Sequence, residues 1–207
     1  MLVQPMYALD LAAARRLVGT HGRATIVTAG PAGLLATYGF CLLEEDDSAL
    51  TVVGHIARAD PQAAELAAGC EALLVFDGPH GYVSASWYRP VETLIPSTWN
   101  YSAVHLHGRP EELVGEEAFD VLRRTLERHE GPLGEDAFDL TGDRLAFARR
   151  LLPGTLAFRL RATSVEAKAK LSQDKPAAVG AAVIDRLAGD GPYAHPALAE
   201  DMRRVLG

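Results

Sequence analysis

Three runs of strand-forming residues follow one another near the amino terminus and constrain the fold more than any other feature. They read ATIVTAG at 24–30, LLATYGFCLL at 34–43 and ALTVVGHI at 49–56, and short turn sequences rich in Pro, Gly, Asp and Ser separate them. Strands joined by such short connections pair with their neighbours in antiparallel fashion. The sequence therefore predicts an antiparallel meander in this part of the chain.

Helical and extended patterns alternate along the rest of the chain. Strands are predicted at 71–76, 81–88 and 98–110, and one long final strand at 155–172. Helices are predicted at 10–18, 115–130 and 143–152 and in the tail, and Asp10 is the expected cap of the first. A further short helix is predicted after Asp60, with Pro61 in its first position and Gly69 at its end. About six or seven strands with covering helices predict one mainly β domain over residues 1–207. We expect an antiparallel barrel with peripheral helices and a helical carboxy-terminal tail from about residue 175.

The composition excludes several classes of protein. A chain of 207 residues with 48% hydrophobic and 23% charged residues is typical of a globular protein, and the net charge of −7 argues against a protein that mainly wraps nucleic acid. No window resembles a membrane span or a leader, so a cytoplasmic protein is expected. Cys41 and Cys70 are expected to be buried, reduced thiols. Direct DNA binding is not favoured, because the arginines of the 115–130 helix are balanced by acidic residues: Arg123, Arg124 and Arg128 against Asp120, Glu127 and Glu130.

The run GYVSASWY at 81–88 carries polar and aromatic residues on one side of the predicted strand. In an extended chain Tyr82, Ser84, Ser86 and Tyr88 fall on one face, while Val83, Ala85 and Trp87 fall on the other. The second face is typical of a core. The first face is either exposed to solvent or part of a binding site.

Polar residues in GHIARADP form a second candidate site. His55 and Arg58 lie between the end of a strand and the start of the helix after Asp60. An arginine near a helix amino terminus is suited to a phosphate, because both present positive potential to an anion. The alternative is a surface arginine beside a histidine of the capping region.

Two later segments hold the remaining candidates. Asn100 and Tyr101 follow Trp99, and an amide can both donate to and accept from the edge of a planar heterocycle. His105 and His107 share a strand face, but no further ligand stands at a persuasive spacing, so a metal is not expected. The segment KAKLSQDKP has two interpretations. Its polar side chains either form a solvated strand face or suit a phosphate or an anionic flavin: Lys168, Lys170, Ser172 and Gln173.

Six segments, taken in order, resemble the FMN-binding negative transcriptional regulators of the PaiB type. They are MY at 6–7, GHIARADPQ at 54–62, EALLVFDGPHGYVSASWY at 71–88, PSTWNYSAVHLHGRP at 96–110, RHE at 128–130 and KLSQDKP at 170–176. The resemblance implies an FMN-binding split β-barrel, related to the pyridoxamine-phosphate oxidase and flavin-reductase-like folds, that forms a homodimer with FMN in two clefts between the subunits.

The resemblance also implies a set of cofactor-binding residues. These are His55 and Arg58 in the phosphate region, Ser84, Ser86 and Trp87 facing the cofactor, Asn100 and Tyr101 beside its ring, and Lys170, Ser172 and Gln173 in a carboxy-terminal motif. The chain departs from the family pattern at Tyr38-Gly39, at Asp60 and at Ala169, where the family has Trp. We expect a vacated flavin pocket at Ala169, which Ala169→Trp would refill.

Three functions remain open from the sequence. The first is a flavin-dependent, oxidoreductase-like protein, in which FMN supplies the redox chemistry. The second is a negative transcriptional regulator, either responsive to FMN or free of cofactor. The third is a split barrel that holds another planar cofactor, haem or a deazaflavin, with His105 or His107 available to a metal.

Overall fold

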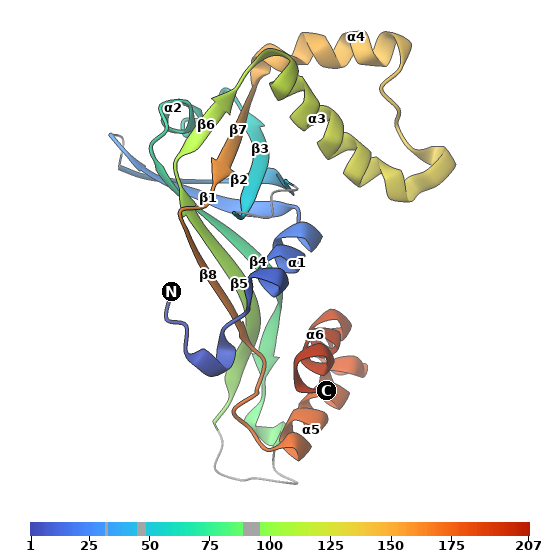
Figure 1. The fold of residues 1–207 in the computed structure, drawn as a ribbon. Helices are drawn as coiled ribbons and strands as arrows, with labels where there is room; N and C mark the ends of the chain where they lie inside the picture. The colour runs from blue at the N-terminus through green and yellow to red at the C-terminus, as the bar shows by residue number, and fades with distance from the viewer. Residues whose placement is uncertain (32, 45–48, 89–95) are drawn as a thin grey trace. The chain divides into compact units, whose positions relative to one another are not determined.

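A computed structural model describes residues 1–31, 33–44, 49–88 and 96–207. Within these ranges the strands form one eight-stranded sheet with the order β6-β7-β3-β2-β1-β4-β5-β8 (Figure 1). The strands are β1 Arg23–Gly30, β2 Gly33–Leu43, β3 Thr51–Ala57, β4 Glu71–Val83, β5 Thr98–Gly108, β6 Pro110–Leu113, β7 Thr155–Arg161 and β8 Ser164–Lys170.

The predicted meander is confirmed by the pairing of its strands. β1 pairs antiparallel with β2 through a tight connection in which Gly30 faces Gly33, and β2 pairs antiparallel with β3 with Phe40 opposite His55. Gly33 has φ +94°, a conformation that residues with a side chain rarely adopt. The pairing thus gives the first three strands one antiparallel register, with a glycine at each side of the first connection.

The prediction of two separate strands at 71–76 and 81–88 is wrong. β4 runs without a break from Glu71 to Val83, and the chain then turns into the 3-10 helix η2 (Ala85–Trp87). Gly78 lies within this strand, at a position where a β-carbon would come within 2.1 Å of the Ser102 hydroxyl oxygen. The glycine that indicated a turn therefore permits close approach of two strands.

The long final strand predicted over 155–172 is two strands. β7 lies between β3 and β6, whereas β8 lies at the opposite edge of the sheet beside β5. The chain leaves β7 at Ala162, whose N–H donates to the Leu50 carbonyl, and at Thr163, whose N–H donates to the His107 carbonyl. Alternation continues through this junction, so periodicity alone gave no signal for the break.

The predicted helices are present, with changes at their ends. Asp10 caps α1 by accepting a hydrogen bond from Ala13 N–H, but the helix continues past Gly19. The helices are α1 Leu11–Thr20, α2 Ala63–Ala67, α3 Gly115–Glu130, α4 Gly142–Leu151, α5 Ala177–Ala188 and α6 Pro196–Leu206, and the 3-10 helices besides η2 are η1 Pro5–Tyr7, η3 Gly131–Asp136 and η4 Leu152–Gly154. Among the described helices, none is both long and apolar enough to cross a membrane.

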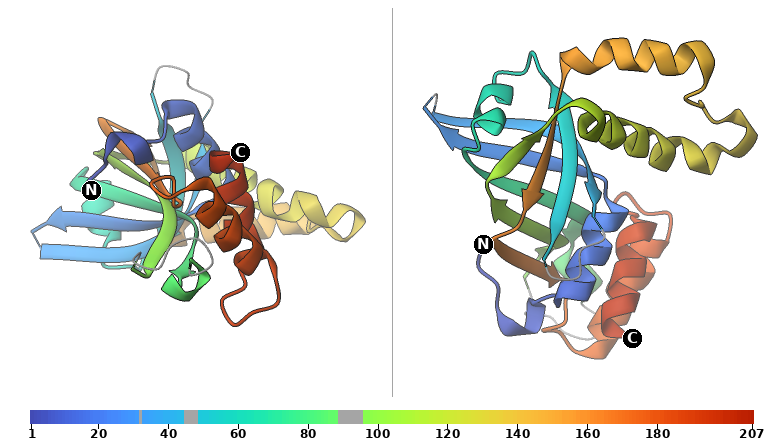
Figure 2. Two further views of the ribbon diagram at one scale, coloured as in Figure 1. Left: turned by 90° about the horizontal axis from the view of Figure 1, so that it is seen from below. Right: turned by 45° about the horizontal axis from the view of Figure 1, so that its top comes forward.

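The chain divides into two compact units, and Figure 2 gives two further views of their elements. The first unit comprises Met1–Leu17, Asp77–Val104 and Glu166–Gly207, and the second comprises Val18–Phe76 and His105–Val165. In the first unit β4, η2, β8, α5 and α6 bury an apolar cluster of Val83, Tyr88, Ala169, Leu171, Val179, Val183, Leu187, Leu198, Ala199 and Met202. In the second unit, α3 packs on the sheet through Leu42, Val53, Leu113, Ala118, Val121 and Ala157. The single domain expected from the sequence stays a prediction.

Candidate functional site

Five aromatic rings form a continuous ladder in the first unit. The ring centroids of His80 and Trp99 are 5.9 Å apart, those of Trp99 and Tyr82 6.5 Å, those of Tyr82 and Tyr193 5.2 Å, and those of Tyr193 and Trp87 6.4 Å. Trp99 is 50% exposed and Tyr193 53% exposed. Rings at these separations attract one another, and their exposed faces are suited to stacking on another planar group. We call these five residues the aromatic ladder.

The serines predicted to face a cofactor lie at the η2 turn. The Ser84 hydroxyl accepts a hydrogen bond from Ser86 N–H at 3.2 Å and lies 2.9 Å from the Ser86 hydroxyl. The Ser97 hydroxyl accepts from Ala85 N–H at 3.0 Å and from the Tyr82 hydroxyl at 2.8 Å. These hydroxyls hold the turn that presents Trp87 to the ladder. Their contact with a cofactor stays a prediction.

Asn100 is fully buried and holds a turn of the backbone. Its Nδ2 donates to the Ser172 hydroxyl at 3.0 Å, and the Ser172 hydroxyl in turn lies 3.2 Å from Asn100 Oδ1. Ser172 has φ +70°, a conformation that is costly for a residue with a side chain. The amide thus fixes the turn after β8, and its predicted contact with a ring stays a prediction.

Two lysines of β8 differ in environment. Lys168 is 8% exposed, and its ammonium lies 5.7 Å from the Tyr7 ring centre and 5.5 Å from that of Tyr101. Its Nζ also donates to the Leu2 carbonyl at 3.0 Å. Lys170 is half-buried, and its Nζ donates to the Thr98 hydroxyl and to the Trp99 carbonyl. Lys170 therefore lies beside the main chain of Trp99, one of the residues of the aromatic ladder. Lys168, in contrast, is enclosed by tyrosine rings.

Gln173 closes the turn after β8. Its Oε1 accepts from Leu171 N–H at 2.6 Å, and its Nε2 donates to the Ala169 carbonyl at 2.6 Å. Ala169 itself is 2% exposed within the apolar cluster of the first unit. The position at which we expected a vacated pocket is thus packed by neighbouring side chains.

A buried hydroxyl of the first unit has no hydrogen-bond partner in the structure described. It belongs to Tyr88, which is 0% exposed. Burial, together with the charge of Asp174 and the nearby Tyr82, raises the pKa of Tyr88. Burial opposes ionisation of Asp174, but Lys175 and a hydrogen bond from Tyr7 outweigh it and lower the pKa of this carboxyl. Tyr88 is thus a neutral donor available to an acceptor.

In the second unit, His55 lies beside Phe40 with ring centroids 5.8 Å apart, and Phe40 meets the His129 ring at 5.7 Å. The His55 Nδ1 atom is buried, and among the described residues it has no hydrogen-bond partner. Burial lowers the pKa of His55, so the neutral imidazole is favoured. The ring therefore carries an unused polar atom without a charge.

Arg58 is already paired in the second unit. Its guanidinium donates to the Glu112 carboxylate at 2.6 Å. Asp60 Oδ1 accepts from Gln62 N–H at 2.9 Å, so a carboxylate lies at the amino end of the five-residue helix α2. The predicted phosphate contact of Arg58 stays a prediction, and a phosphate there would compete with two carboxylates.

Several residues of the site were missed from the sequence. Tyr193 lies in the loop before α6, where neither periodicity nor a motif marks it. Thr98 and Ser97 gave no signal beyond their place next to Trp99. Cys41 is buried and Cys70 half-buried, both as free thiols, and burial raises the pKa of Cys41 to about 12. Across the described ranges no cluster of three metal-ligating side chains is present.

The fold of this chain is similar to that of solved structures of proteins described as binding flavin or as flavocytochromes. The structure of the FAD and heme binding protein from Mycobacterium smegmatis matches with a TM-score of 0.58 at 19% identity, covering 77% of this chain and 71% of that chain. The flavocytochrome Anf3 from Azotobacter vinelandii matches with a TM-score of 0.57 at 15% identity, covering 81% and 72%.

The family model described as "Putative FMN-binding domain" matches residues 1–164, and the chain belongs to this family. Protease synthase and sporulation protein PAI 2 of Bacillus subtilis is 31% identical over 152 residues, which cover 73% of this chain and 71% of that protein. The resemblance drawn from the six sequence segments is thereby confirmed.

Proposed function

We propose that this chain binds FMN and that the aromatic ladder lies at the flavin ring. The ladder is the observation that carries the proposal, because it places two half-exposed rings, Trp99 and Tyr193, in a chain of a flavin-binding family. The residues fit the group chemically: flat apolar faces suit an isoalloxazine ring, and the unpartnered Tyr88 hydroxyl is a neutral donor for a ring acceptor.

The remaining predicted residues divide into two roles in this proposal. Residues of the first unit that would contact the cofactor directly are Ser84, Ser86, Trp87, Tyr101 and Lys170. The prediction that His55 and Arg58 hold the phosphate is the alternative, because both residues belong to the second unit. Asn100, Ser172 and Gln173 would act as positioning residues, because their polar groups hydrogen-bond within the turn after β8. Lys170 is the cation best suited to the phosphate, since no carboxylate is paired with it among the ion pairs of the described residues.

We further propose a flavin-dependent, oxidoreductase-like function in a cytoplasmic homodimer. Bound FMN supplies reversible electron transfer, while the chain supplies stacking surface, hydrogen bonds and charge. An FMN-responsive negative regulator is the second reading, and it rests on the resemblance of the six sequence segments to the PaiB-type regulators. Direct DNA contact through α3 is not part of this proposal, because Arg123 is held by Asp120 and Glu127.

Haem is the alternative cofactor, and it draws support from the heme-binding relative of similar fold. The absorption spectrum of the purified protein separates the two, since haem and flavin absorb differently in the visible region. A haem spectrum without flavin would contradict the FMN proposal.

Tryptophan fluorescence tests the position of the ring directly. The chain has two tryptophans, and both belong to the aromatic ladder. Titration with FMN should quench their emission, and Trp99→Phe should remove much of the quenching while the thermal midpoint stays unchanged. The matched control is Val205→Ala, which changes a 40% exposed apolar side chain of α6 in the same unit. FMN binding with no quenching would place the flavin away from the ladder.

A further inference from the structure

A buried carboxylate of the second unit is paired with no cationic side chain. Glu65 lies in the first turn of α2 and is 5% exposed, and none of the ion pairs among the described residues includes it. Its Oε1 atom is buried, and no described residue forms a hydrogen bond with it. A charge enclosed in this way is costly unless an opposite charge or further donors compensate it.

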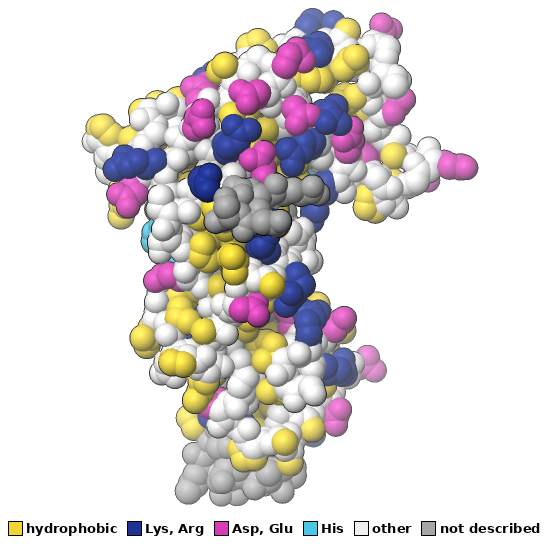
Figure 3. Space-filling model, in the orientation of Figure 1, with side chains coloured by type: hydrophobic (Ala, Val, Ile, Leu, Met, Phe, Trp, Pro, Cys, Tyr) yellow, Lys and Arg dark blue, Asp and Glu magenta, His cyan; other side chains and the backbone are white. Residues whose placement is uncertain are grey.

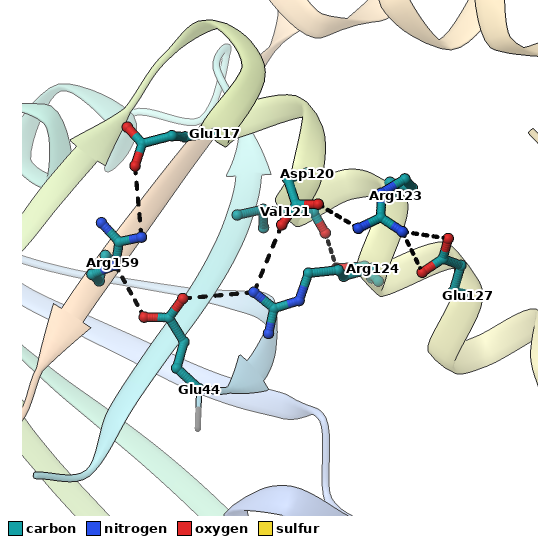
Figure 4. Close-up of polar contacts among 9 residues, drawn as sticks. Glu44, Glu117, Asp120, Val121, Arg123, Arg124, Glu127 and Arg159 are labelled. Atoms are coloured by element: carbon teal, nitrogen blue, oxygen red, sulfur yellow. Dashed lines mark hydrogen bonds and ion pairs between the residues drawn. The ribbon is translucent and has the colours of Figure 1, made fainter. Parts of the chain in front are cut away.

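Other carboxylates of the same unit are paired with arginines. Figure 4 shows Glu44 between Arg124 and Arg159, at 3.6 Å and 3.0 Å, and Glu127 beside Arg123 at 2.6 Å. On the face drawn in Figure 3, basic and acidic side chains likewise lie next to one another. The lack of a cationic side chain is therefore a property of the buried site and not of the whole unit.

The second oxygen of Glu65 belongs to a buried hydrogen-bond network. The Thr28 hydroxyl donates to Glu65 Oε2, and the same hydroxyl accepts from Gln62 Nε2 at 3.0 Å. Thr28 and Gln62 are each 1% exposed. The polar groups of Gln62 and Glu65 therefore lie next to each other, because both bind the one hydroxyl of β1.

The contacts of Gln62 fix which end of its amide lacks a partner. Besides Thr28, its Nε2 donates to the main-chain carbonyls of Ile26 at 3.1 Å and of Leu35 at 3.4 Å. A carbonyl oxygen can only accept, so the amide nitrogen must face these groups and the amide oxygen points away from them. Gln62 Oε1 is buried, and within the described ranges it has no hydrogen-bond partner. The network thus ends in two unpartnered acceptor oxygens.

Gly30 allows the carboxylate to lie against the main chain of β1. A β-carbon at this position would lie 2.4 Å from Glu65 Oε1, which is too close for any side chain. Gly30 is the last residue of β1 and faces Gly33 across the connection to β2. The free carboxylate oxygen is therefore enclosed by protein, and only a small group can reach it.

We propose that Glu65 Oε1 and Gln62 Oε1 bind a monovalent cation of the alkali type. Hard cations prefer oxygen ligands, and carbonyl oxygens can replace the hydration shell of such an ion. One carboxylate is neutralised by a single positive charge, whereas Ca²⁺ sites generally use several carboxylates. A water molecule can donate to both oxygens but leaves the negative charge in place. The site is separate from the aromatic ladder and goes beyond the proposed flavin function.

The bound ion would hold α2 on β1. α2 has five residues, and a helix of this length is not stable in isolation. The main-chain carbonyls of the two proposed ligands, Gln62 and Glu65, accept from the N–H groups of Leu66 and Cys70, each at 3.0 Å. Ion binding should therefore increase the protection of these two amides.

Thermal unfolding of the full chain tests the ion, with potassium, sodium or choline chloride at equal ionic strength. At an alkali concentration about ten times the dissociation constant, Tm should lie about 3–6 °C above its value in choline chloride. Glu65→Gln keeps the shape of the side chain and removes its charge, so it should abolish this difference. Glu135→Gln, at an exposed position of the same unit, is the matched control and should retain it. Equal Tm values of the parent in all three salts would overturn the proposal in favour of water or a proton.

Hydrogen exchange locates the ion. In potassium or sodium chloride the amides of Leu66 and Cys70 should exchange about tenfold more slowly than in choline chloride, and Glu65→Gln should remove the difference. A salt-dependent Tm without this protection would place the ion elsewhere and refute the site. If Glu65→Gln does not fold, exchange in the parent decides. The same dependence on salt is expected with and without added FMN, so a failure of the flavin proposal leaves this test intact.

Discussion

Asn100 of β5 and Ser172 of the turn after β8 hydrogen-bond to each other in both directions, 72 residues apart in the chain. Both side chains are buried. Among the non-glycine residues that the structure describes, Ser172 alone has a positive φ. Such a backbone conformation costs about 1–3 kcal/mol and persists where its surroundings hold it. The pair therefore stabilises the turn that carries Gln173 and Asp174.

Asn100→Ala should lower the free energy of unfolding by about 1–3 kcal/mol, because the Ser172 hydroxyl loses its partner in a buried place. Urea unfolding measures this change. Ser86→Ala is the control, since among the described residues that exposed hydroxyl hydrogen-bonds to Ser84 alone, and its loss should cost less than about 0.5 kcal/mol. Equal effects of the two substitutions would contradict the structural role given to Asn100.

Ala169→Trp should destabilise the protein. The position is 2% exposed in the apolar cluster, so a large ring overpacks it at a cost of about 1–3 kcal/mol. The structure thus reverses the expectation of a vacated pocket. Thermal midpoint and FMN affinity are measured together, with Ala178→Trp at an exposed site of α5 as control. A stable variant with tighter FMN binding would restore the earlier expectation.

Lys170→Ala should weaken FMN binding by about 1.5–3 kcal/mol, the usual range for a hydrogen bond to a charged group, and should leave riboflavin binding unchanged. Arg58→Ala should have a smaller effect, because Glu112 already neutralises the guanidinium. Calorimetric titration of both flavins checks this order. If Arg58→Ala proves the more damaging, the phosphate lies in the second unit.

His55 should make stability depend on pH. Its pKa in the folded chain is lowered by burial, so below the ordinary value near 6.5 the unfolded chain binds a proton that the folded chain does not. Stability is then lost as pH falls from about 6.5 towards the lowered value, and the loss is constant below it. The difference between parent and His55→Gln unfolding curves isolates this contribution. Parallel curves across that window would refute the assignment.

The strands and helices could be predicted because local patterns specify them. Alternation and turn residues marked β1, β2 and β3, and apolar spacing marked α3. The sequence did not mark the end of β4 at Val83 or the break at Ala162, because both depend on which distant strand the backbone joins. Asn100 was singled out for its chemistry, but its partner lies across the fold. Tyr193 gave no local signal, since only packing brings it to Tyr82.

The pairing of β3 with β7 has a consequence for synthesis on the ribosome. Gly54 faces Phe158, so β3 emerges about a hundred residues before the strand that covers its edge. At about 5–20 residues per second, that edge waits for roughly 5–20 s with its backbone groups open to other chains. Nascent chains stalled before residue 155 should therefore recruit holdase chaperones, and release should follow once β7 has left the exit tunnel.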